Sequence, residues 1–116
     1  MNNNTAFDEL TFFAKVKKRP GMFLGSKSLI SLRDQLFGMS YAFSACGYPD
    51  ALKLFRAFIE YYNNKLFQTD KNGYACWWNH LLYTSGGMDD EAFDSFYRAF
   101  EKYLLENHRM TLPVIE

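Results

Sequence analysis

Apolar residues recur at helical spacing in five segments of this 116-residue chain, and polar or glycine-containing turns separate the segments. Steps of three and four residues place such side chains on one face of an α-helix. The pattern predicts helices over about 6–18, 29–46, 52–66 and 74–83, and a fifth from residue 89 onward. No stretch alternates well enough to predict a sheet. We therefore expect residues 1–116 to form a single all-α domain, a bundle-like packing of about five helices.

Several helix ends carry recognisable signals. Thr5 and Asp8 have the spacing of a capping box, Ser28 is a natural N-cap, and Gly47 can adopt the left-handed conformation that ends a helix. The strongest apolar stripe lies in 52–66 and is widened on one side, so we expect this helix to be central. Residues 109–116 alternate only weakly and are expected to be extended or loosely docked.

The most densely punctuated stretch follows the first helix. The basic run 17–19 suits a helix C-terminus, where the last carbonyl groups carry partial negative charge, and Pro20 stops the helix. The apolar residues 22–24 lie between Gly21 and Gly25, where the backbone can turn. We expect them to form a loop that tucks inward as a plug.

Residues 19–25 are similar to an Arg-Pro-Gly-Met-aromatic-aliphatic-Gly run in the ATPase subunits of type II topoisomerases. The helix that follows lacks the Asn and Glu needed for Mg-ATP, however, and no Asp-x-Gly-x-Gly follows. A second resemblance extends further. The run 17–25, Ser28-Leu29 at a helix start, and then Leu32, Gly38 and Ala42 resemble a group of small helical bacterial proteins encoded beside polymorphic and contact-dependent growth-inhibition toxins.

This second resemblance covers about the first third of the chain, with weaker similarity at Trp78 and in 93–97. It implies a non-enzymatic immunity protein that binds one cognate toxin, the C-terminal toxin domain of a large secreted protein. A nuclease is the favoured toxin. The immunity protein would block the toxin's active site or its partner surface.

Composition adds a charge asymmetry to this picture. The chain is neutral overall, but residues 1–58 hold eight basic and four acidic residues, whereas 59–116 hold five and nine. The acidic half suits a basic partner. A neutral protein without a concentrated positive face is a poor nucleic-acid ligand. Aromatic residues make up 19% of the chain, which predicts a ring-rich core and some exposed tyrosine.

The acidic residues at the start of the last helix are the main candidate for a partner site, alongside their ordinary role of stabilising a helix N-terminus and a possible metal patch. They are Asp89, Asp90, Glu91 and Asp94. We expect Tyr83 and Tyr97 to be exposed beside them. Trp77 and Trp78 are adjacent on a helix and cannot both face the core, so one of them is a candidate interface anchor.

Groups suited to catalysis are few, and we expect no catalytic residue, cofactor or metal. Cys76 and His80 share a helical face, and His108 lies near a helix end, but neither histidine has a partner at metal-ligand spacing. Cys46 and Cys76 are expected to be buried free thiols.

The alternative function is that of a small nucleic-acid-associated regulatory or adaptor protein, acting through the basic residues Lys15, Lys17, Lys18 and Arg19. A solvated helix cap is the simpler interpretation of these four charges. The N-terminal residues have no signal-peptide pattern and no apolar segment approaches spanning length, so we expect a cytoplasmic protein without a membrane partner.

Overall fold

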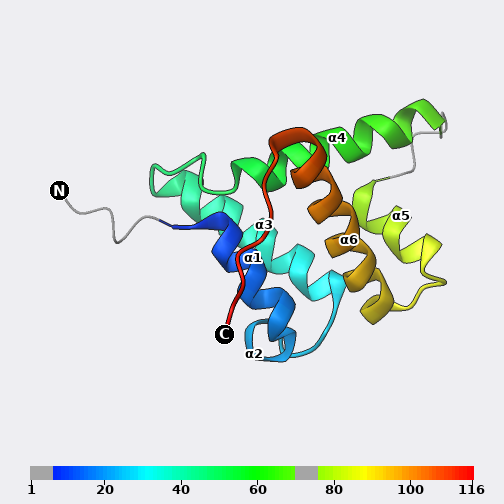
Figure 1. Ribbon diagram of the computed structural model, residues 1–116, viewed down its shortest axis with the longest axis horizontal. Coiled ribbons are helices and arrows are strands. Elements are labelled where there is room, and N and C mark those ends of the chain that lie inside the picture. The colour runs from blue at the N-terminus through cyan, green and yellow to red at the C-terminus, as the bar shows by residue number, and fades with distance from the viewer. Residues whose placement is uncertain (1–6, 70–75) are drawn as a thin grey trace.

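The computed structural model describes residues 7–69 and 76–116, and within these ranges it contains six helices and no strand (Figure 1). The predicted all-α class is confirmed, and the five predicted helices are present. A short sixth helix was not predicted. The helices are α1 (Glu9–Lys18), α2 (Pro20–Leu24), α3 (Leu29–Ala45), α4 (Lys53–Thr69), α5 (Trp77–Thr84) and α6 (Asp89–His108).

Side-chain caps fix the starts of two helices. Ser28 is the N-cap of α3, as predicted, and its Oγ accepts a hydrogen bond from the Ser31 amide at 3.0 Å. The first helix begins later than predicted because Asp8 is its N-cap and accepts from the Thr11 amide at 3.1 Å. This bond lowers the pKa of the Asp8 carboxyl. The predicted capping residue Thr5 lies outside the described residues.

The predicted loop after α1 is the five-residue helix α2. Pro20 occupies its first turn, where a missing N–H has no consequence, and Gly25 ends it with φ 81°. Phe23 and Leu24 are half-buried and pack against the core, whereas Met22 is exposed. The predicted inward plug is therefore wrong for Met22, because the helical turn places that residue on the outer side.

Helix α6 is the centre of the fold. It packs against α3, α4 and α5, and Figure 1 shows it in the middle of the molecule. Its buried residues are Ala92, Phe93, Phe96, Tyr97, Phe100, Tyr103 and Leu104. The prediction that helix 52–66 is central is wrong. Figure 1 shows the second half of α4 continuing past α6, which leaves that half with fewer neighbours.

The charged side chain of Glu9 lies inside the core. Glu9 is only 7% exposed, and its carboxylate accepts hydrogen bonds from the amides of Leu54 and Phe55 at 3.0 and 2.6 Å. These amides belong to the first turn of α4, where the backbone N–H groups have no acceptor within their own helix. Burial raises the pKa of the Glu9 carboxyl, although the two amide bonds act in the opposite direction. The start of α1 thus caps the start of α4.

The chain after α6 returns across α1 (Figure 1). Arg109 turns it with φ 55°, and residues 109–116 have no regular secondary structure, as predicted. Leu112 packs against the core, and Lys18 Nζ donates hydrogen bonds to the main-chain oxygens of Ile115 and, at 3.1 Å, Glu116. This segment is therefore docked by the Leu112 side chain and by the bonds from Lys18 to its main-chain oxygens.

Candidate protein-binding site

Two of the four acidic residues predicted to bind a partner, Asp89 and Asp94, make contacts within the fold. The Asp89 carboxylate accepts from the Ile30 amide at 3.1 Å and from the Ser28 hydroxyl, so it joins the start of α6 to the start of α3. Asp94 forms a 2.6 Å ion pair with Lys27. The sequence revealed helix-start acids but not these partners, which come from a segment about 60 residues away.

Replacing Asp89 by alanine is expected to lower the free energy of unfolding by about 1–2 kcal/mol, because the Ile30 amide and the Ser28 hydroxyl both lose an acceptor. Asp90→Ala is the matched control, since among the described residues the Asp90 side chain accepts its hydrogen bond from the amide of the next residue, Glu91. Urea unfolding of both variants measures the difference. Equal losses would show that the hydrogen bonds of Asp89 to Ile30 and Ser28 contribute nothing measurable to stability.

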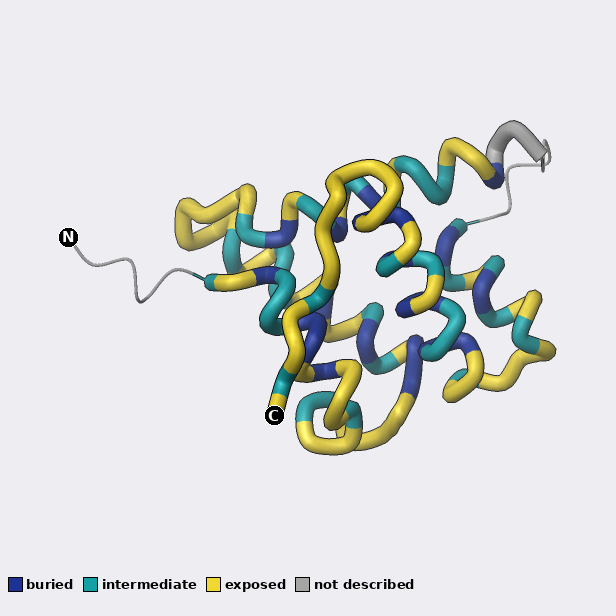
Figure 2. Tube along the Cα trace, in the orientation of Figure 1, coloured by how far each residue is buried: buried dark blue, intermediate teal, exposed yellow. Residues whose placement is uncertain are grey.

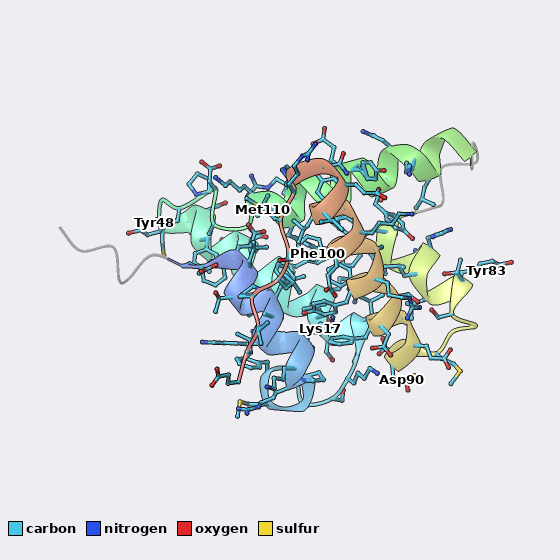
Figure 3. All side chains as sticks on the ribbon, viewed as in Figure 1. Lys17, Tyr48, Tyr83, Asp90, Phe100 and Met110 are labelled. Carbon is cyan, nitrogen blue, oxygen red and sulfur yellow. The ribbon has the colours of Figure 1, made fainter. Side chains whose placement is uncertain are left out.

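The other two acids are available to a partner. Asp90 and Glu91 are exposed, and no ion pair to either occurs among the side chains that the structure describes. Tyr83 is 84% exposed, as predicted, and Met88 is exposed on the turn before α6. Figure 3 shows Tyr83 and Asp90 projecting outward at the same end of the molecule. We call Tyr83, Met88, Asp90 and Glu91 the corner surface.

Tyr97 is not part of that surface, and the prediction that it is exposed is wrong. Its ring is buried, and its hydroxyl donates to the Phe13 carbonyl oxygen at 2.7 Å. Burial, with a smaller contribution from the Glu101 charge, raises the pKa of the Tyr97 hydroxyl. Tyr97 therefore fastens α6 to α1 in the core.

The two tryptophans divide as predicted, one inward and one partly outward. Trp77 is buried against Phe55 and Phe96, with ring centroids 5.6 Å apart in both pairs, which removes it from the candidate partner residues. Trp78 is half-buried, and its ring lies 5.8 Å from Phe37 and 5.2 Å from the Arg33 guanidinium. Trp78 therefore contacts α3 and is not joined to the acids of α6.

Both histidines contact tyrosines. His80 Nδ1 lies 2.7 Å from the Tyr62 hydroxyl, and His108 Nε2 lies 3.0 Å from the Tyr103 hydroxyl. Burial raises the pKa of both tyrosines, so each phenol keeps its proton at neutral pH. The phenol O–H can then donate a hydrogen bond to the imidazole nitrogen. In the described part of the chain, no three His, Cys, Asp or Glu side chains lie together as metal ligands would.

The cysteines are both free thiols, as predicted, but the prediction that they are buried is wrong for Cys46. Cys46 is exposed at the end of α3, and Cys76 is half-buried at the N-cap of α5. The described residues beside it, Ser44, Ala45 and Gly47, are exposed as well.

The basic cluster is partly used within the fold. Lys17 forms a 2.6 Å ion pair with Glu101, and Lys18 holds the C-terminal segment. Together with Leu112 and Pro113 these side chains line a shallow groove between α1 and that segment. Lys15 and Arg19 remain exposed.

Sequence reasoning thus identified Asp90, Glu91 and Tyr83 on the surface. It missed Met88, which carries no signal beyond its place next to two glycines in a turn.

Across the described ranges, no helix combines the length and apolarity needed to cross a bilayer. Compared with protein-family models, with curated proteins and with solved structures, the chain matches none.

Proposed function

We propose that this protein is an immunity protein, which binds a basic toxin domain through the corner surface and neutralises it by covering its active site or its partner surface. The observation that carries the proposal is the pair of exposed carboxylates, Asp90 and Glu91, at the same end of the molecule as exposed Tyr83 (Figure 3). Unpaired acids and an exposed aromatic side chain at one end of the molecule can provide charge complementarity and an anchor, which are the two components of tight protein recognition.

The rigidity of the corner supports this role. Asp90 and Glu91 lie in the first turn of α6, and neighbouring Asp89 ties that turn to α3. The carboxylates are therefore presented by a fixed backbone, which limits the entropy lost on binding. Carboxylates at fixed positions can take the place of nucleic-acid phosphates in a basic cleft. A nuclease toxin fits this chemistry.

The resemblance of residues 17–25 to small helical immunity proteins adds a separate line of support. In the structure this run forms the end of α1 and the whole of α2, and Lys17 and Lys18 make internal contacts. The residues that carry the resemblance therefore support the fold, while the proposed partner surface lies elsewhere on the chain. A family could keep such a scaffold and vary the binding surface to suit different toxins.

The alternative, nucleic-acid binding by the basic N-terminal half, has less support from these contacts. Two of the four cationic side chains of that cluster are occupied, Lys17 by Glu101 and Lys18 by main-chain oxygens. Lys15 and Arg19 remain. Two exposed charges provide little of the counterion release that drives phosphate binding.

The test is co-expression of the tagged protein with the neighbouring open reading frame in its native host, followed by pull-down and mass spectrometry. We expect a one-to-one complex with the C-terminal domain of a large secreted protein. The double substitution Asp90→Lys and Glu91→Lys should weaken that complex on the order of 100-fold, and more at low salt than at high salt.

The matched control is Glu60→Lys with Glu106→Lys, which changes the net charge equally at two exposed positions away from the corner. Equal weakening by both pairs would remove the corner surface from the proposal. Recovery of nucleic acid in place of a toxin would overturn the proposal, and Lys15→Glu with Arg19→Glu would then locate the contact.

A further inference from the structure

The C-terminal segment is held to the helices by few contacts. We call residues 111–116 the strap. Leu112 and Ile115 are half-buried, and the other four residues of the strap are exposed (Figure 2). From Thr111 onward, the described backbone forms no hydrogen bond with other backbone groups. Segments with few buried side chains and few backbone bonds are the first to open in a folded protein.

Lys18 makes the polar contacts that hold the strap to α1. Its Nζ donates hydrogen bonds to the main-chain oxygens of Ile115 and, at 3.1 Å, Glu116. Because both acceptors are backbone atoms, the contact needs the ammonium group but no particular side chain of the strap. An ammonium group on a flexible stem can release such oxygens without any movement of the helix. Lys18 is therefore placed to act as a latch.

The strap does not seal against the helix below it. A shallow groove remains between the two, with Ala14 and Lys17 of α1 on one side and Leu112 and Pro113 of the strap on the other. Well-packed protein interiors leave no such space between their side chains. Opening the strap therefore breaks few close contacts.

The packing of α1 against α6 does not depend on the strap. The Tyr97 hydroxyl donates to the Phe13 carbonyl oxygen at 2.7 Å, and Lys17 forms its 2.6 Å ion pair with Glu101. Both contacts join the two helices directly, and neither includes a residue of the strap. We therefore expect the helices to stay together when the strap lifts.

Helix α6 is also closed off before the strap begins. Arg109 turns the chain in the left-handed conformation, and the Met110 amide donates to the Leu104 carbonyl oxygen at 3.1 Å. Bonds of this kind satisfy the last carbonyl groups of a helix. Rotation of the backbone after Met110 can then lift the strap and leave the end of α6 intact.

We propose that the strap is a conformational device that opens and closes over α1 independently of the helical core, with Lys18 as its latch. In the closed state the strap holds Lys18 and covers the groove. In the open state, populated at about 0.1–10%, Lys18 is released beside Lys15 and Arg19, which are exposed on the same helix end. The strap thus sets whether two or three cationic side chains are available at the end of α1.

The first experiment measures the reactivity of the Lys18 amine towards a limiting dose of an acetylating reagent. Mass spectrometry reads the product, with Lys15 as the internal reference. Leu112→Asp removes the half-buried anchor and should raise the Lys18 rate by more than about threefold, because the open population increases. Val114→Asp is the matched control. Val114 is 91% exposed on the same strap, so this variant should leave the rate unchanged.

The second experiment separates an open strap from a loosened core by NMR relaxation of the backbone amides. Lys18→Met should lower the order parameters of the strap below about 0.6, while residues 93–104 of α6 stay near the rigid value of about 0.85. Lys15→Met is the control and should change neither.

Three results would overturn the proposal. The first is an equal rise in Lys18 reactivity with Leu112→Asp and Val114→Asp. The second is a strap that is already mobile in the wild-type protein, or one that stays as rigid in Lys18→Met as in the wild type. The third is a loss of order in α6 together with the strap, because the strap would then not open independently of the core.

Discussion

Phe96→Ala is expected to lower the free energy of unfolding by about 3–5 kcal/mol, the largest change that any single substitution here should produce. The Phe96 side chain is fully buried and has aromatic neighbours from every long helix except α3. The ring centroids lie between 5.3 and 6.2 Å from that of Phe96, and the neighbours are Phe13, Phe55, Phe58, Trp77, Tyr97 and Phe100.

The size of the effect follows from the position of Phe96 between helices. Removing the ring leaves a cavity lined by all of these neighbours, and the rigid helices cannot move far enough to fill it. A loss of this size is a large part of the roughly 5–15 kcal/mol by which a domain is stable. We therefore expect a variant that is partly unfolded at 37 °C.

Urea unfolding followed by far-ultraviolet circular dichroism measures this loss. Phe96→Leu is the conservative variant and should recover most of the stability, because it keeps the site apolar and nearly filled. Tyr83→Ala removes an equally large ring from the surface and should change the stability by less than about 0.5 kcal/mol. A small loss for Phe96→Ala would mean that the core is loosely packed around α6.

Glu9→Ala is expected to have the next largest effect, because it leaves two amides in the first turn of α4 without acceptors. A buried donor without a partner costs about 1–3 kcal/mol. Glu9→Gln keeps one acceptor oxygen but turns an amide group toward the second N–H, so we expect about half the loss. Thermal unfolding of the two variants compares them, with Glu60→Gln as a control at an exposed position.

The dependence on pH has a definite sign. The pKa of Glu9 in the folded protein is raised above its ordinary value of 4.5, so the folded state holds the proton more tightly than the unfolded chain. The contribution of Glu9 is therefore complete below pH 4.5 and falls as the pH rises through the raised pKa. The stability difference between wild type and Glu9→Gln should be larger at pH 4.5 than at pH 8. A difference that shrinks on acidification would contradict this assignment.

Local signals in the sequence predicted the helices well. Ser28 and Gly47 mark the two ends of α3, and the three- and four-residue spacing from Phe93 to Leu104 gives the buried face of α6. Each of these signals depends on residues within a few positions of one another. The class of fold follows from them without any knowledge of the tertiary contacts.

Contacts between distant segments account for the errors. The buried position of Tyr97 depends on the Phe13 carbonyl, and that of Glu9 depends on two amides of α4. Asp89 was grouped with Asp90 because they are neighbours in sequence, yet only Asp89 faces α3. An exposed acid and a structural acid look identical in a sequence, and only the fold separates them.

The central position of α6 has a consequence for how the chain is made. The helix comes last in the sequence, and its bonds to α1 join residues 84 positions apart. A growing polypeptide emerges from the ribosome N-terminus first, so the apolar faces of α1, α3, α4 and α5 are exposed to solvent before the helix that covers them has been synthesised. We therefore expect that the core does not form segment by segment during synthesis. The nascent chain should bind chaperones until residues 93–104 have emerged.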